Sequence, residues 1–157
     1  MLMEDKDYFY NQATDSDASP FWYGSNPNEK LPDKQTFFKY WSDTYFENEK
    51  DQKGRCFHIM RKGQSIGMIS YRSISMGQVE VDILIYNKEN WNHGYGTSAI
   101  KLLSKYLSAR FHVDEVWINI NKDNARAIKA YEKAGYMLFP SEKAGYEKLV
   151  KKFEVEV

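Results

Sequence analysis

The sequence predicts a single α/β domain over residues 1–157, with a mixed, mostly antiparallel central sheet flanked by helices. The length of 157 residues is close to that of one ordinary domain. Hydrophobic residues make up 42% of the chain and aromatic residues 16%, which is enough to bury a core without disulfide or metal support. Strand-like runs rich in β-branched residues alternate with stretches at helical spacing, and this alternation indicates strands and helices within one layered structure.

The N-terminal part is the least regular. Residues 8–14 are predicted as a first strand, and residues 20–23 as a short helical or irregular piece. Glycine, proline, asparagine and serine are frequent in residues 24–35, which predicts a loop.

An aromatic stripe follows this loop. Phe37, Trp41 and Tyr45 recur every four residues, with Phe38 beside them, so residues 36–47 are predicted as a helix that buries one face.

The middle of the chain predicts an antiparallel meander. Strands are expected at residues 56–60, 65–75 and 78–86, because turn residues at 62–64 and 76–77 separate these apolar runs.

The C-terminal half predicts a strand-helix-strand crossover that starts from the last strand of the meander. Helical spacing is found at residues 97–111 and 124–134, and strand-like runs at 113–120, 136–139 and 146–155. We expect the chemistry at the crossover.

Charge and cysteine content exclude several classes. Lysine and arginine number 22, as do aspartate and glutamate, so no net charge draws the protein to nucleic acid or to an anionic membrane. The single cysteine, Cys56, excludes a disulfide framework, and the three histidines have no metal-ligand spacing. A Cys56–His58 nucleophile is a minor alternative to an inert buried cysteine. The N-terminus has no secretory signal pattern and no stretch is long and apolar enough to span a bilayer, which favours a cytoplasmic protein.

A loop with two glycines lies between a predicted strand and a predicted helix, at residues 91–99. Backbone N–H groups at a helix start can bind an anion such as a phosphate. A turn that merely requires glycine torsions explains the same residues equally well.

The loop also fits the dinucleotide fingerprint, through Gly94, Gly96 and Ala99, with acidic residues about 20 positions later. Two details disagree with that interpretation. Residues 87–93 separate the strand from the glycines, and the acidic residues 114–115 stand at the start of the next strand instead of its end. The absence of a Gly-Lys-Ser/Thr sequence excludes a P-loop.

Two ordered motifs resemble those of the GNAT superfamily of acetyl-coenzyme A (acetyl-CoA)-dependent N-acetyltransferases. Residues 91–96 match Gln/Arg-x-x-Gly-x-Gly/Ala, except that Trp91 replaces the first residue. Residues 124–136 are similar to Asn-x-x-Ala-(x)3-Tyr-(x)3-Gly-Phe, with Tyr136 for Phe. The close match covers residues 79–139, whereas earlier segments agree only in the order of elements.

The resemblance implies a binding site for acetyl-CoA and no metal. The pantetheine arm would pair with the strand backbone where two central strands splay apart, near Ile83, Leu84 and Ile85. Asn124 would hold the cofactor beyond the next strand. The diphosphate would lie on backbone N–H groups of the loop, at His93, Gly94, Tyr95, Gly96 and Thr97.

Two carboxylates precede the loop. Glu80 and Asp82 are two residues apart on a strand, so they share one face and can accept a proton or bind a cationic amine. Their mutual repulsion would raise one pKa toward a useful range. The solvent face of an antiparallel strand is the alternative explanation. Some relatives carry the acid where Asp82 stands, others nearer Glu80.

Tyr131 stands three residues after Ile128, where a core aromatic is also expected. The resemblance instead implies a tyrosine beside the cofactor sulfur, which protonates the departing thiolate. Since most of the rate would come from holding the amine beside the thioester, loss of Tyr131 should slow turnover without abolishing it.

Together, these features predict an N-acetyltransferase that moves an acetyl group by direct attack of a primary amine. The acceptor would be a small cationic molecule, aminoglycoside-like or polyamine-like, or a peptide N-terminus. The resemblance implies that the N-terminal helices wall its cleft, so some of the aromatics there would touch the acceptor: Phe21, Trp22, Tyr23, Phe37, Phe38, Trp41 and Tyr45. The alternative is a non-catalytic acyl-CoA-binding sensor or scaffold. Paired C-terminal strands would allow a homodimer; no nucleic-acid or membrane partner is expected.

Overall fold

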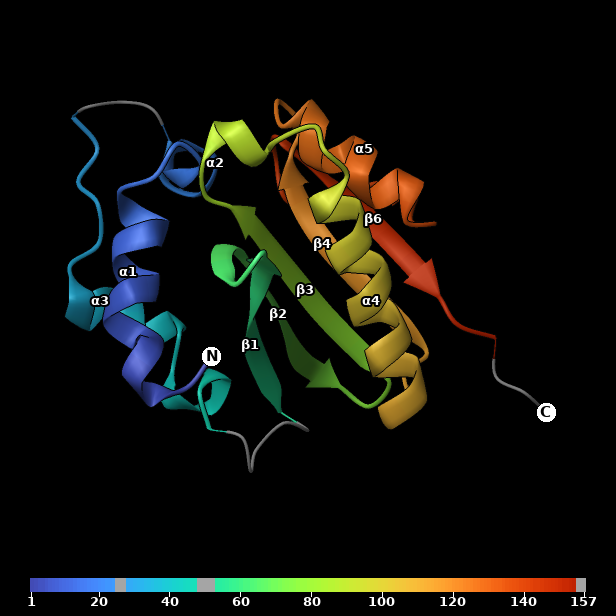
Figure 1. Cartoon of the computed structure of the whole chain (residues 1–157). Helices are drawn as coiled ribbons and strands as arrows, with labels where there is room; N and C mark the ends of the chain where they lie inside the picture. Colours follow the sequence, from blue (N-terminus) through green and yellow to red (C-terminus); the bar gives the residue numbers. More distant parts are fainter. Residues whose placement is uncertain (25–27, 48–52, 155–157) are drawn as a thin grey trace.

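A six-stranded sheet runs through the computed structural model, which describes residues 1–24, 28–47 and 53–154 (Figure 1). Residues 25–27 of the predicted first loop and residue 155 of the predicted last strand lie outside the described residues. The strands are β1 (Gly54–Arg61), β2 (Gln64–Ser75), β3 (Gln78–Ile85), β4 (Glu115–Asn121), β5 (Met137–Phe139) and β6 (Tyr146–Lys152).

Five α-helices accompany the sheet in the described part of the chain: α1 (Lys6–Thr14), α2 (Ser19–Tyr23), α3 (Lys34–Tyr40), α4 (Tyr95–Arg110) and α5 (Ala125–Lys133). Short 3-10 turns lie at η1 (Met3–Asp5), η2 (Asp43–Tyr45) and η4 (Lys88–Asn90). None of the helices in these ranges combines the length and apolarity needed to cross a membrane.

The strand order is β1-β2-β3-β4-β6-β5. Strands β1, β2 and β3 form the predicted antiparallel meander. The chain then passes through α4 and returns as β4, parallel to β3, which is the predicted crossover. Strands β4, β6 and β5 pair antiparallel. The predicted fold class is therefore confirmed.

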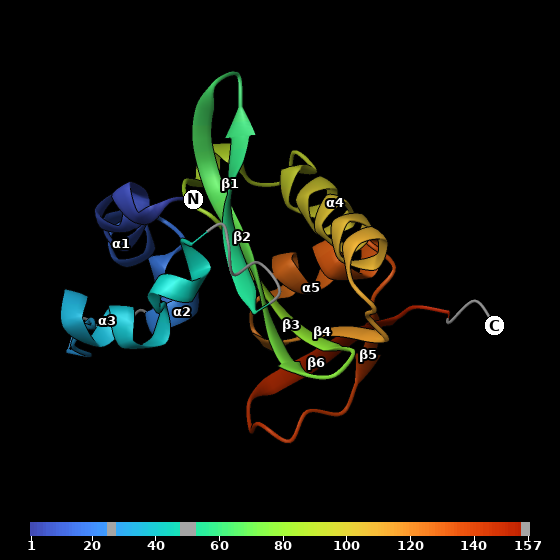
Figure 2. The ribbon, with the colours of Figure 1, turned by 90° about the horizontal axis from the view of Figure 1, so that it is seen from below.

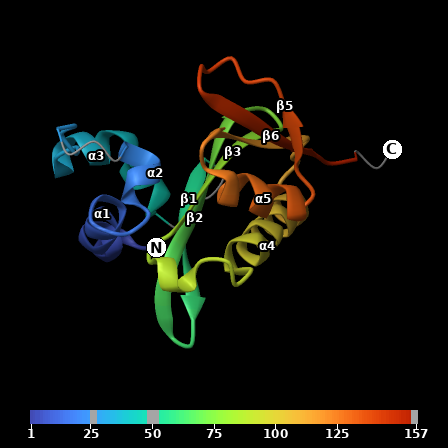
Figure 3. The ribbon, with the colours of Figure 1, turned by 90° about the horizontal axis from the view of Figure 1, so that it is seen from above.

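Helices cover both faces of the sheet, with α1, α2 and α3 on one face and α4 and α5 on the other (Figures 2 and 3). Alternation along β3 divides its side chains between two cores. Leu84 packs in the cluster with Phe9 and Phe37 of the first three helices. Val79 and Val81 pack in the cluster with the residues of α4 and α5.

The prediction of a strand at residues 8–14 is wrong, because this segment lies in helix α1. The tyrosines and phenylalanine there favour a strand by propensity, but the two buried residues, Phe9 and Ala13, are one helical turn apart. Tertiary packing decides the outcome. The ring of Phe9 lies 5.3 Å from that of Phe37 and 5.1 Å from that of Trp41.

The predicted helix at 36–47 is only partly correct. Helix α3 starts earlier, after Asp33, whose carboxylate accepts a hydrogen bond from the Thr36 N–H at 2.8 Å. The helix ends at Tyr40, since Trp41 leaves helical torsions with φ −84° and ψ 65°. The aromatic stripe is buried nonetheless, because the η2 turn continues the same packing surface.

Strands β3 and β4 separate soon after they meet. Only Gln78, Val79 and Glu80 of β3 pair with β4, so the β4-facing edge of β3 is open from Val81 onward. The splay that the resemblance implied is therefore present.

Strand β5 forms one edge of the sheet, and its side chains are exposed: Met137 at 68%, Leu138 at 52% and Phe139 at 37%. A homodimer through the C-terminal strands stays a prediction.

Candidate active site

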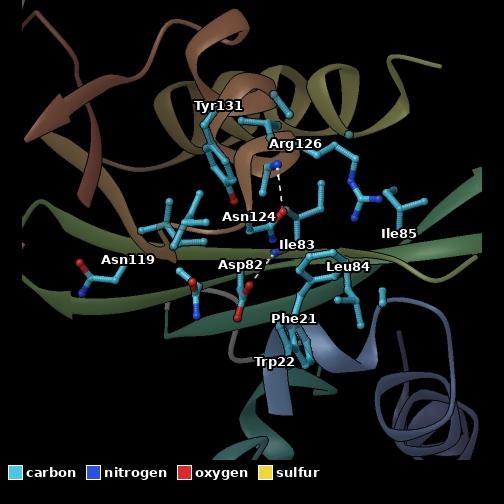
Figure 4. Close-up of a pocket in the computed structure, with 18 of the residues that line it drawn as sticks. Phe21, Trp22, Asp82, Ile83, Leu84, Ile85, Asn119, Asn124, Arg126 and Tyr131 are labelled. Atoms are coloured by element: carbon cyan, nitrogen blue, oxygen red, sulfur yellow. Dashed lines mark hydrogen bonds between the residues drawn. The ribbon is translucent and has the colours of Figure 1, made fainter. Parts of the chain in front are cut away.

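A cavity of about 770 Å³ lies at the splay between β3 and β4. It is bounded by β3, β4, α2, α3, the glycine loop and α5 (Figure 4). Most of the site residues predicted from the sequence line it: Glu80, Asp82, Ile83, Leu84, Ile85, Gly94, Tyr95, Gly96, Thr97, Asn124 and Tyr131. His93 does not line it. The exposed His93 ring stacks on Tyr95 at 5.7 Å.

The open edge of β3 presents backbone groups of alternate residues. Tyr86 donates its N–H to Ile66 of β2 at 3.0 Å, so Leu84, two residues earlier, also directs its backbone toward β2. Ile83 and Ile85 therefore face the open edge. The Ile83 N–H donates to Asp82 Oδ1 at 2.9 Å.

The indole of Trp91 contacts the open edge of β3. Its Nε1–H donates to the carbonyl of Ile85 at 2.8 Å, which joins the glycine loop to the end of β3. The Ile83 carbonyl and the Ile85 N–H remain on the open side as an acceptor and a donor for a peptide-like amide.

The glycine loop ends in a helix start that faces the cavity. Gly94 caps α4 with φ 82°, a left-handed torsion that favours glycine. A Cβ on Gly96 would meet only Ile83 Cδ1, at an ordinary 3.8 Å, so the packing of the free protein does not require glycine there. First-turn N–H groups have no partner within a helix. The space beside Gly96 and the free N–H donors of this first turn are features that suit an anion which approaches the backbone closely.

Two polar groups of the second motif line the opposite wall. Asn124 caps α5 by accepting a hydrogen bond from the Ala127 N–H at 3.3 Å. Tyr131 is fully buried, and its hydroxyl has no hydrogen-bond partner among the described residues. Burial, with smaller effects of Tyr136 and Asp82, raises the pKa of Tyr131 well above its usual value. An orphan hydroxyl at a cavity wall is suited to a ligand atom.

Asp82 approaches the cavity from the other face of the sheet (Figure 4). Burial, and to a smaller extent the charge of Glu80, raises the pKa of Asp82 from 3.8 to about 7. The hydrogen bond from the Ile83 N–H and one with the Trp22 side chain act in the opposite direction. A carboxyl group with this pKa exists in both protonation states near neutral pH.

Glu80 differs from Asp82 because it already has a cationic partner. Its Oε2 lies 2.5 Å from Arg72 Nη2, and its side chain is 23% exposed. Arg72 and Glu80 stand opposite each other on β2 and β3, so the pair follows from the strand register.

An aromatic wall that the motifs did not specify surrounds Asp82. Tyr23 and Tyr40 line the cavity, and Asp82 is the second largest influence, after burial, that raises the pKa of each phenol. Trp22 stacks on Trp41 with ring centroids 5.5 Å apart. The density of aromatic residues in the N-terminal segments was the sequence signal for this wall. Tyr40 lies off the helical stripe and was missed.

Arg126 is the other residue that sequence reasoning missed. It lines the cavity from the first turn of α5, with its guanidinium carbon 3.4 Å from the centroid of the Trp91 ring.

The Cys56–His58 pair does not form a nucleophilic site. Cys56 is fully buried, and burial raises the pKa of its thiol far above its usual value. The His58 ring instead contacts Ser65 Oγ at 2.8 Å and Asp5 Oδ1 at 3.4 Å. Across residues 1–24, 28–47 and 53–154, no group of three His, Cys, Asp or Glu is arranged to hold a metal ion.

Known proteins share this architecture. Aminoglycoside acetyltransferase AAC(6')-Ib in complex with coenzyme A and kanamycin has a TM-score of 0.74 and 19% identity, over 97% of this chain and 91% of that one. Spermidine N-acetyltransferase from Vibrio cholerae, in complex with CoA and spermine, has a TM-score of 0.72 and 14% identity, over 97% and 92%. At these identities the likeness shows the fold.

Similar proteins are also found by comparison of sequences. Spermidine N(1)-acetyltransferase of Escherichia coli strain K12 is 26% identical over 137 residues, which are 85% of this chain and 69% of that protein. A family model described as an acetyltransferase (GNAT) domain matches residues 2–137. Because this match covers most of the chain and agrees with the sheet, the splay and the glycine loop, the protein belongs to the GNAT acetyltransferase family.

Proposed function

We propose that the protein transfers the acetyl group of acetyl-CoA to a primary amine of a small cationic acceptor, by direct attack of the amine on the thioester. One observation carries this proposal. Asp82 and Tyr131, a carboxyl group with a pKa near 7 and a phenol without a partner among the described residues, reach the same gap from opposite faces of the sheet.

The cavity fits acetyl-CoA in two places. The first turn of α4 offers backbone donors to the diphosphate, and Gly96 leaves room for its close approach. Ile83 and Ile85 offer a carbonyl and an N–H to the amides of the pantetheine arm, as a neighbouring strand would. His93 is proposed to contribute its backbone N–H only, since its side chain lies outside the cavity.

The surroundings of Asp82 favour a cationic acceptor. Asp82 and Glu80 supply negative charge, and the aromatic rings of Trp22, Tyr23 and Tyr40 supply faces that attract an ammonium group. The relatives named above act on spermidine or aminoglycosides, which agrees with this class. A peptide N-terminus is also an amine and belongs in the same test.

Asp82 is the proposed base. A free ammonium group has a pKa near 10.4, so proton transfer to an ordinary aspartate would be unfavourable by about 9 kcal/mol. Raising the pKa of Asp82 to about 7 reduces this gap to about 5 kcal/mol. Glu80 is proposed to help bind the cationic acceptor and to support the raised pKa of Asp82 through its charge. It is not the proposed base, because its carboxylate is already paired with Arg72.

Tyr131 is the proposed donor to the departing sulfur. Its raised pKa keeps the phenol neutral throughout the working pH range. The hydroxyl can therefore donate a hydrogen bond to the developing thiolate, which stabilises charge that the ground state lacks. The raised pKa makes complete proton transfer less favourable, so hydrogen bonding is expected to supply most of the effect.

The experiment is CoA thiol release from acetyl-CoA with a panel of polyamines, aminoglycosides, amino acids and short peptides, for the wild type, Asp82→Asn and Tyr131→Phe. We expect release that depends on a cationic amine and falls in both variants. Binding of acetyl-CoA without release by any acceptor would instead support the sensor or scaffold alternative.

A further inference from the structure

The Arg126 side chain lies in an unusual environment at the cavity wall. Its guanidinium carbon is 3.4 Å from the Trp91 ring centroid and 5.1 Å from that of Phe21 (Figure 4). The residue is half-buried, and burial lowers the pKa of Arg126. Within the described ranges, no carboxylate lies within ion-pair distance of it. A partly desolvated cation without a counter-ion is unfavourable in the free protein.

The position on α5 adds to this effect. Arg126 stands in the first turn of the helix, where the helix dipole is also positive. Cations are normally placed at the other end of a helix. The start of α4 faces the same cavity, so two helix N-termini and one guanidinium converge there. An anion would relieve this concentration of positive charge.

Trp91 links the guanidinium to the glycine loop. Trp91 precedes Gly94 by three residues, and its indole N–H is fixed to the Ile85 carbonyl at 2.8 Å. The ring is thus held as a platform, and Arg126 stacks on it from the neighbouring helix. No lysine or arginine occurs within residues 91–97, so Arg126 supplies a cation that the loop itself lacks.

We propose that Arg126, held over the ring of Trp91, binds the diphosphate of acetyl-CoA together with the backbone of the glycine loop. A planar guanidinium can donate two hydrogen bonds to a phosphoryl group, which an ammonium cannot match in geometry. The proposal rests on the proposed function only in that acetyl-CoA is the ligand. It makes Arg126 a binding residue and Trp91 a positioning residue.

Calorimetric titration with three ligands tests the proposed role of Arg126 without measuring turnover. Coenzyme A has the diphosphate and a 3′-phosphate, dephospho-coenzyme A has the diphosphate only, and pantetheine has neither. For Arg126→Gln we expect the affinity for the first two ligands to fall equally, by about 10- to 100-fold, because a charge-assisted hydrogen bond is lost. The affinity for pantetheine should not change.

Two variants serve as controls. Lys101→Gln removes one exposed positive charge from α4 outside the cavity and should leave all three affinities unchanged. Arg126→Lys keeps the charge and should lose less affinity than Arg126→Gln.

A double-mutant cycle tests the platform. Trp91→Ala should weaken binding of dephospho-coenzyme A, and its effect should be less than additive with that of Arg126→Gln, because each change removes the same contact. Trp91→Phe keeps an aromatic face and should be milder. Additive effects would overturn the role of Trp91.

Four results would overturn the assignment of Arg126. If Arg126→Gln lost affinity for pantetheine by the same factor, the residue would shape the cavity and not bind the diphosphate. If the variant lost affinity for coenzyme A but not for dephospho-coenzyme A, Arg126 would bind the 3′-phosphate. Unchanged binding of all ligands by Arg126→Gln, with normal binding by the wild type, would refute this inference alone. A wild type that binds none of the three ligands would overturn the proposed function and this inference together.

Discussion

Asp82 should make the protein less stable as the pH rises, and Asp82→Asn should remove this effect. The folded-state pKa of Asp82 is about 7, against 3.8 for the ordinary group. Between these values the folded state holds a proton that the unfolded state has released, so the free energy of unfolding decreases as the pH rises through this window. The full shift corresponds to about 4 kcal/mol, of which roughly 2 to 3 kcal/mol falls between pH 5 and pH 8.

The assay is urea unfolding of the wild type and Asp82→Asn at pH 5, 6.5 and 8. All other titrating groups are shared, so the difference in unfolding free energy between the two proteins isolates Asp82. We expect this difference to move in favour of the variant by roughly 2 to 3 kcal/mol from pH 5 to pH 8. Asp123→Asn, which removes an exposed carboxylate in a turn, is the matched control. A difference between wild type and Asp82→Asn that does not change with pH would refute the reasoning.

Three further predictions concern the site. Tyr131→Phe should lower kcat by about 100-fold. It should not lower thermal stability, because the deleted hydroxyl has no partner among the described residues. A fall in melting temperature would indicate a structural role instead. Gly96→Ala should keep or increase stability, since its Cβ has ordinary contacts, but should weaken coenzyme A binding measured by calorimetry; unchanged binding would contradict close approach of the ligand. The pH profile of kcat/KM should rise through about pH 7 as Asp82 ionises. Glu80→Gln should shift that rise to lower pH, because it removes a negative charge that raises the pKa of Asp82. A profile without this rise would exclude Asp82 as the base.

The strands of the meander and the crossover could be predicted from sequence because their signals are local. Glycine-containing turns separate runs of alternating or β-branched residues, and the helices after the loop have clear apolar spacing. The N-terminal segments depend on packing. Helix α1 contains residues that favour strands, and its state is decided by the contacts of Phe9 with α3 and its flanking residues.

The sequence could predict which residues belong to the site, but not how their side chains are arranged in it. Spacing placed Glu80 and Asp82 on one strand face, but only the register of β2 and β3 pairs Arg72 with Glu80, which makes Asp82 the proposed base. Leu84 was predicted with Ile83 and Ile85 to pair with the pantetheine arm, but the alternation of the β3 backbone directs its N–H and carbonyl toward β2 and away from the open edge. The contact between Trp91 and Arg126 joins residues far apart in the sequence, so no local pattern indicates it.

The most direct measurement of the central claim is product analysis by mass spectrometry. The wild type would be incubated with acetyl-CoA and an equimolar mixture of a polyamine, an aminoglycoside and a short peptide. The account predicts that a cationic amine gains one acetyl group on nitrogen, at a rate that Asp82→Asn lowers. Consumption of acetyl-CoA without any acetylated amine, or equal product from Asp82→Asn at every pH, would contradict it.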